Sequence, residues 1–67
     1  MKKFNIDFIE KRLYLMGITE ADLKILHTSF EEIYFRIKRN RFNRIFIIKL
    51  SLILQCTPPN LLITDNH

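Results

Sequence analysis

The segment from Ile45 to Leu54 constrains the fold of this 67-residue chain more than any other feature, because it is apolar at nearly every position. Its only charged residue is Lys49, and Asn43 stands where it can cap a helix. We therefore expect a helix over roughly Arg44 to Gln55. A helix that is hydrophobic all round must be covered all round, by other helices or by a partner. This one is too short to span a bilayer.

Two further helices are expected in the first part of the chain. The first runs from about Asn5 to Met16, and the only glycine, Gly17, supplies the left-handed residue that ends it. Thr19 then caps a second helix, in which Asp22 offers a carboxylate to the helix N-terminus. The spacing of the apolar residues predicts that these helices turn inward Ile9, Leu13, Met16, Leu23 and Leu26.

The clearest local signal is a capping box at Ser29. Glu32 follows this serine by three residues, so a third helix should begin at Phe30, with Ile33 and Ile37 on the same inner face. Only a short turn separates it from the second helix. The pair therefore forms a helix-turn-helix whose second helix can enter the major groove of DNA. The opposite face carries Glu31, Glu32, Phe35, Arg36, Lys38 and Arg39.

The C-terminal part predicts one more helix. Thr57 as cap, with Pro58 at the first helical position, starts a short fifth helix that ends near Leu62. No segment sustains the alternation of a strand. The sequence thus predicts an all-α, compact five-helix domain over residues 1–67, with residues 64–67 frayed.

The charge pattern favours an anionic partner. The net charge is +4, and five cations fall within nine residues with no acid among them. Such a cluster suits the C-terminal end of a helix, and with this fold it also suits nucleic acid. The five are Arg36, Lys38, Arg39, Arg41 and Arg44.

The residue types needed for catalysis or for a metal site do not come together. His27 and His67 each stand without a cysteine or acid at ligand spacing, so we expect no metal and no cofactor. The single cysteine, Cys56, is expected to pack in the core. No nucleophile and base can be paired, so we expect no enzyme. Acids at Asp7 and Glu10 interrupt any signal peptide, which indicates a cytoplasmic protein without a membrane partner.

Three groups of residues, taken together, show an order and spacing that are typical of one protein family. They are Arg12, Gly17, Ile18, Thr19 and Leu23, then Ile37, Arg39 and Asn40, then Lys49, Leu50, Ser51, Leu54, Thr57, Pro58, Leu61 and Leu62. In this order the chain resembles the Cro and phage-repressor (XRE-type) helix-turn-helix family over about Phe8 to Leu62. The resemblance implies a lambda-repressor-like DNA-binding fold. Glu20 stands where the family has a glutamine that commonly binds a phosphate.

The resemblance implies a sequence-specific transcriptional regulator, a repressor of the phage Cro, restriction-control or antitoxin type, that docks its third helix in the major groove as a dimer. The residues expected nearest the base edges are Ser29, Glu31, Glu32, Phe35 and Arg36. Those expected at phosphates are Arg39, Arg41 and Arg44, with Arg12 and Thr19 on the other side. The surplus of apolar surface predicts a homodimer interface that includes Ile48, Leu52, Leu61 and Leu62.

Two alternatives remain open at this stage. Glu32 can serve the third helix itself, by closing the capping box and pairing with Arg36. The chain can also be a protein-interaction module, an antitoxin or anti-regulator that binds a toxin or another regulatory protein. It would do so through the apolar fourth helix or the acidic start of the third. A membrane-surface peptide is a weaker option, against which the regular caps argue.

Overall fold

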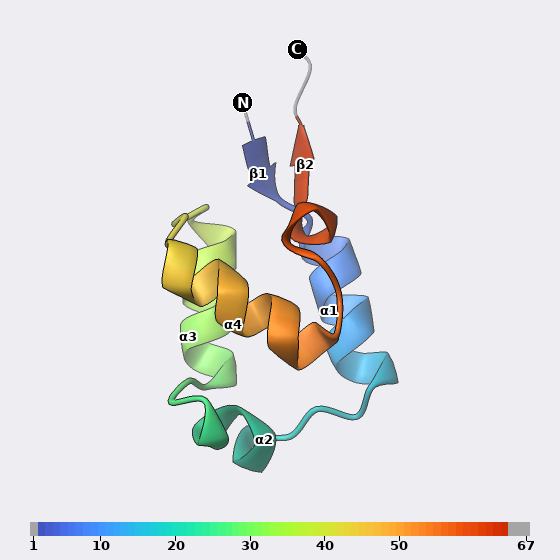
Figure 1. Cartoon of the computed structure of the whole chain (residues 1–67), viewed down its shortest axis with the longest axis vertical. Coiled ribbons are helices and arrows are strands. Elements are labelled where there is room, and N and C mark those ends of the chain that lie inside the picture. Colours follow the sequence, from blue (N-terminus) through green and yellow to red (C-terminus); the bar gives the residue numbers. More distant parts are fainter. Residues whose placement is uncertain (1, 65–67) are drawn as a thin grey trace.

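Polar side chains begin each α-helix in the computed structural model, which describes residues 2–64 (Figure 1). In every case the side-chain oxygen of the cap accepts a hydrogen bond from the backbone N–H three residues later, at 3.1–3.3 Å. The predicted caps of the second, third and fourth helices are confirmed, because capping depends only on neighbouring residues. The helices are α1 (Ile6–Leu15) after Asn5, α2 (Glu20–Ile25) after Thr19, α3 (Phe30–Lys38) after Ser29 and α4 (Arg44–Leu54) after Asn43.

Each of these helices is followed by a residue in the left-handed backbone conformation. Gly17 was expected at this position after α1, and its φ is 62°. The residue that follows the left-handed one donates its N–H to the carbonyl five positions back, at 2.9–3.2 Å, which closes the last turn. The left-handed residues are Gly17, His27, Asn40 and Gln55.

The core lies where α4 crosses α1 and α3 (Figure 1). From α4, the side chains of Leu50 and Leu54 are fully buried. Ile33 and Ile37 of α3 are fully buried as well, which confirms the predicted inner face of that helix. The buried apolar side chains are Phe4, Ile9, Leu13, Leu23, Ile33, Ile37, Phe46, Leu50, Leu54 and Leu61.

Two short strands contradict the prediction of an all-α domain. β1 (Lys2–Phe4) pairs antiparallel with β2 (Leu62–Thr64), in a register that sets Phe4 opposite Leu62. The N–H of Asn5 continues the pairing by donating to the carbonyl of Leu61 at 2.7 Å. The strands stand together at one end of the molecule, and α2 lies at the other (Figure 1). Thr64, expected to be frayed, lies in β2; the rest of the predicted frayed tail is outside the described residues.

The fifth helix is also a correction. Pro58–Leu61 forms a single 3-10 turn, η1, so the described part of the chain has four α-helices and a two-stranded sheet in place of five helices. The N–H of Asn60 donates to the carbonyl of Thr57 at 3.0 Å, the i to i+3 bond of a 3-10 turn, and the backbone is already extended at Leu62, so no α-helical turn follows. Thr57 does not cap this turn, since its hydroxyl lies against the side-chain oxygen of Asn60. The chain then extends into β2.

Candidate nucleic-acid interface

The outer face of α3 is an exposed and charged surface. Ile33 and Ile37 fix the inner side of α3 against the core, and the helical period turns the residues between them outward. Phe35 lies at the centre of that outer face and is 48% exposed, between exposed Glu31 and exposed Lys38. A surface of this kind has no packing function inside the chain.

Two arginines surround the ring of Phe35. The guanidinium carbon of Arg39 lies 4.2 Å from the ring centroid and that of Arg41 lies 5.9 Å from it. The left-handed backbone of Asn40 brings the second arginine back to the helix, where its N–H donates to the carbonyl of Arg36 at 2.9 Å. Cations over an aromatic face are attracted by its quadrupole. The turn after α3 thus gathers two cations around one exposed ring.

Three arginines near the end of α3 have no carboxylate partner among the described residues. Within residues 2–64, no Asp or Glu oxygen lies within ion-pair distance of Arg39, Arg41 or Arg44, and all three residues are exposed. Arg44 is the first residue of α4, one short loop beyond the other two. The predicted arginine cluster is therefore available to an anion at these three positions.

Arg36 differs from Arg39, Arg41 and Arg44 because its guanidinium is paired with a carboxylate of the same helix. Its Nε lies 3.3 Å from Oε1 of Glu32, and its guanidinium carbon lies 5.4 Å from the ring centroid of Phe46. The Glu32 carboxylate also accepts from the hydroxyl of Thr28 at 3.4 Å. Glu32 thus forms the ion pair with Arg36 that the sequence analysis gave as one of its alternatives.

The capping box at Ser29 is formed only in part. The hydroxyl of Ser29 accepts from the N–H of Glu32 at 3.1 Å, but the Glu32 side chain turns to Arg36 and does not return to the N–H of Ser29. The prediction that Glu32 closes the capping box, by accepting from the N–H of Ser29, is therefore wrong. Glu20 of α2 binds the next backbone group instead, because its Oε1 accepts from the N–H of Phe30 at 2.8 Å. Glu20 therefore joins α2 to the start of α3.

A shallow hollow lies between α3 and α4, beside the pair formed by Glu32 and Arg36. It has a volume of about 210 Å³. Glu32 and Arg36 are paired on its α3 wall and Lys49 lies on its α4 wall, so the hollow offers a ligand charges of both signs. Its lining residues are His27, Thr28, Glu32, Arg36, Asn43, Ile45, Phe46 and Lys49.

Two of the residues predicted at phosphates form hydrogen bonds within the chain. Arg12 of α1 donates from Nε to the carbonyl of Leu54 at 2.9 Å and from Nη2 to that of Gln55 at 3.2 Å, so it caps the C-terminus of α4. Thr19 is bonded to Asp22 in the capping box of α2. Since α1 and α3 lie on different sides of α4, the structure does not bring Arg12 to the outer face of α3 (Figure 1).

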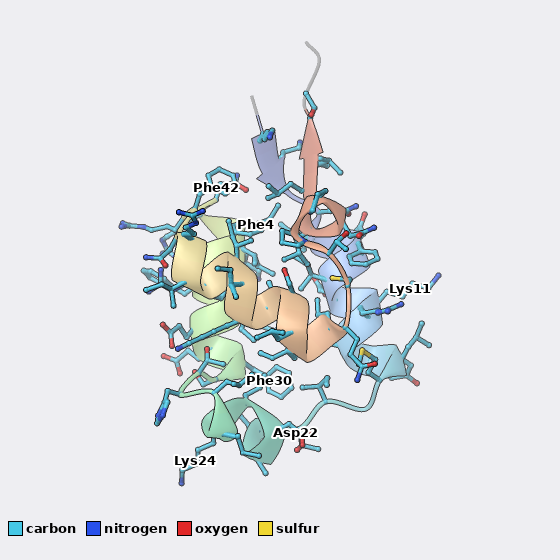
Figure 2. All side chains as sticks on the ribbon, viewed as in Figure 1. Phe4, Lys11, Asp22, Lys24, Phe30 and Phe42 are labelled. Carbon is cyan, nitrogen blue, oxygen red and sulfur yellow. The ribbon has the colours of Figure 1, made fainter. Side chains whose placement is uncertain are left out.

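The N-terminal strand lies next to the turn after α3, which the sequence did not predict. The N–H of Phe4 donates to Oδ1 of Asn40 at 2.9 Å, and the ring centroids of Phe4 and Phe42 are 4.9 Å apart (Figure 2). Lys2, exposed in β1, therefore belongs to the same end of the molecule as Arg41. No pattern within three residues could have indicated this long-range contact.

The outer side of α4 is an exposed apolar stripe. Ile45, Ile48 and Leu52 follow the helical spacing i, i+3, i+7 and are 66%, 49% and 66% exposed. Two residues predicted for a dimer interface, Ile48 and Leu52, thus lie on the surface. Leu61, predicted for the same interface, is fully buried in the core and is therefore not available to a partner, whereas Leu62 is half-buried in β2.

The remaining chemistry is sparse. Cys56 is half-buried beside Arg12, and burial raises the pKa of its thiol, which disfavours the nucleophilic thiolate, although the nearby guanidinium partly opposes the shift. In the described part of the chain, no three His, Cys, Asp or Glu residues gather as a metal site would require. No described helix has both the length and the apolar character that a membrane span needs.

Comparison with protein-family models, with curated proteins and with solved structures finds no match to this chain.

Proposed function

We propose that this protein is a small DNA-binding regulator of the helix-turn-helix type, which inserts α3 into the major groove. One observation carries the proposal: the outer face of α3 is exposed, and it ends in arginines that no described carboxylate neutralises. A short α2, a tight turn and a longer α3 with a free outer face are the parts of this motif. In a cell without a nucleus, such a partner would put the protein in the cytoplasm.

The proposed contacts divide into two kinds. Arg39, Arg41 and Arg44 lie at the C-terminal end of α3 and the start of α4, where the DNA backbone would run, and they would neutralise phosphates. Glu31 and Phe35 project from the outer face, where base edges would lie. Arg36 and Glu32 would support the helix, because each is held by the other. Affinity would come from the first group and sequence choice from the second.

A homodimer would complete the regulator. The stripe formed by Ile45, Ile48 and Leu52 is apolar surface that no described residue covers, and a second copy of the chain would bury it. A two-fold axis there would present two α3 helices to one duplex.

Salt-dependent binding tests the proposal directly. Fluorescence anisotropy with a random-sequence duplex, repeated over a range of salt concentrations, gives the number of phosphates neutralised. Arg39→Ala and Arg41→Ala should each weaken binding to every duplex and lower the salt slope by about one unit. The expected result follows because each substitution removes one phosphate contact.

Lys11→Ala is the matched control. Lys11 also carries one positive charge, but it lies on the outer side of α1, across the molecule from α3 (Figure 2). Its loss should leave the salt slope unchanged. If the triple variant Arg36→Ala, Arg39→Ala, Arg41→Ala keeps the affinity of the wild type, the groove-docking proposal is wrong.

A protein partner is the second candidate. The observation that favours it is the exposed acidic start of α3, where Glu31 would face phosphates that repel it. A toxin or another regulatory protein with a basic surface would match this end of the helix. Absence of duplex binding at low salt would favour this candidate over the first.

A further inference from the structure

Phe35 is the one large apolar side chain on an otherwise charged helix face. It lies between Glu31 one turn before it and Arg39 one turn after it, and about half of its surface is exposed. The two guanidinium groups that approach its ring hold it in place. An aromatic ring exposed at the centre of a charged surface is available for contact with a partner.

The rest of the α3 face limits how bases could be recognised. The helix has no Asn or Gln, the residues that bind adenine through two hydrogen bonds. Its one arginine, Arg36, is paired with Glu32 and lies over the ring of Phe46, so it would have to leave both to bind guanine. Phe35 offers no hydrogen bond, so its contribution to recognition has to be apolar.

The major groove contains one apolar group on a base edge, the 5-methyl group of thymine. We propose that Phe35 is a specificity-determining residue that packs against the 5-methyl group of a pyrimidine in the major groove. The inference rests on the proposed function, since it requires α3 to enter the groove. Thymine and 5-methylcytosine share this chemistry, and the experiment below separates them.

Stacking of an unpaired base on Phe35 is disfavoured by the same geometry. The guanidinium carbon of Arg39 lies 4.2 Å from the ring centroid, so this guanidinium occupies space in which a base would stack on the ring. A ring already covered in this way can still present its edge to a methyl group. The geometry therefore favours duplex DNA over a single strand.

Duplexes that differ only in the methyl group provide the test. One pair is an alternating dA–dT duplex and the same duplex with dU for dT, and a second pair is an alternating dG–dC duplex with and without 5-methylation of cytosine. Burial of one methyl group should give the wild type a preference of about threefold to fourfold for the methylated member. Preference in both pairs assigns the contact to the methyl group itself, and preference in the first pair alone assigns it to thymine. Both results support the proposal.

Two substitutions at the same position supply the controls. Phe35→Ala should remove the preference and bind both members of each pair alike, whereas Phe35→Leu, which remains apolar, should keep part of it. Because the ring is half exposed, both variants should retain the circular dichroism spectrum of the wild type. Lys11→Ala should keep the full ratio.

The results that overturn the inference are distinct from those that overturn the proposed function. A wild type that binds no duplex at low salt contradicts both. Equal affinity for all members contradicts the methyl contact alone, as does an undiminished ratio in Phe35→Ala. Tighter binding to single-stranded oligo-dT than to the dA–dT duplex assigns Phe35 to base stacking and overturns the inference.

Discussion

A left-handed residue follows each α-helix within residues 2–64, and glycine occupies only the first of these positions. His27, Asn40 and Gln55 have φ values of 58°, 49° and 51°, in a region where a Cβ atom is crowded by the backbone. Asn tolerates this conformation best of the three, and Asn40 also uses its side chain to hold β1. Gln55 is exposed, and its side chain forms no hydrogen bond with another residue of the described range that would compensate this strain.

Gln55→Gly should therefore stabilise the protein. Removing the Cβ atom relieves the left-handed strain, and part of that gain is lost to the greater freedom of glycine in the unfolded chain. The net increase in the free energy of unfolding should be about 0.5–1 kcal/mol. Urea denaturation followed by circular dichroism measures it. Gln55→Ala is the control, since it keeps the Cβ atom and should give no increase; an equal gain in both variants would contradict the explanation.

At the scale of the elements, the signals that depend on nearby residues predicted the helices well. Thr19, Ser29 and Asn43 each bond to a backbone group three residues away, so their effect can be seen in the sequence. The inner face of α3 was predicted for the same reason, from the helical period of Ile33 and Ile37. The exposed position of Phe35 follows from that face.

The missed features depend on residues far apart in the chain. β1 and β2 have three residues each, too few to show alternation, and pair across almost the whole sequence. The approach of Arg41 to Phe35 depends on the left-handed backbone of Asn40, a conformation that the sequence analysis did not predict at this position. The bond from Arg12 to the end of α4 likewise spans more than forty residues of sequence.

Arg12 joins two elements, and its removal should cost stability. Its two hydrogen bonds to carbonyls at the C-terminus of α4 are charge-assisted and partly exposed. Arg12→Ala should lower the free energy of unfolding by about 1–2 kcal/mol. Lys11→Ala, at the neighbouring exposed position, removes the same charge and should leave stability unchanged. If Arg12→Ala is as stable as the wild type but binds duplexes less tightly, Arg12 contacts a phosphate, as the family resemblance implied.

At the scale of the whole molecule, the two proposed surfaces belong to different helices. The charged face lies on α3, and the apolar stripe of Ile45, Ile48 and Leu52 lies on the outer side of α4. The sequence predicted that α4 is covered on all sides. The core covers its inner side, and a partner would cover its outer side. Because the two surfaces do not share residues, a substitution in the apolar stripe leaves the proposed DNA-contacting side chains of α3 unchanged.

Leu52→Glu should convert the proposed dimer into a monomer that remains folded. The side chain is 66% exposed, so the substitution leaves the core intact, but it would place a charge inside an apolar interface. Sedimentation equilibrium should show a dimer for the wild type at micromolar concentration and a monomer for the variant. Duplex affinity should fall as well, because two linked contacts become one. Leu15→Glu, at an equally exposed leucine of α1, should remain dimeric. A wild type that is monomeric at high concentration contradicts the homodimer and leaves α4 to a different protein partner.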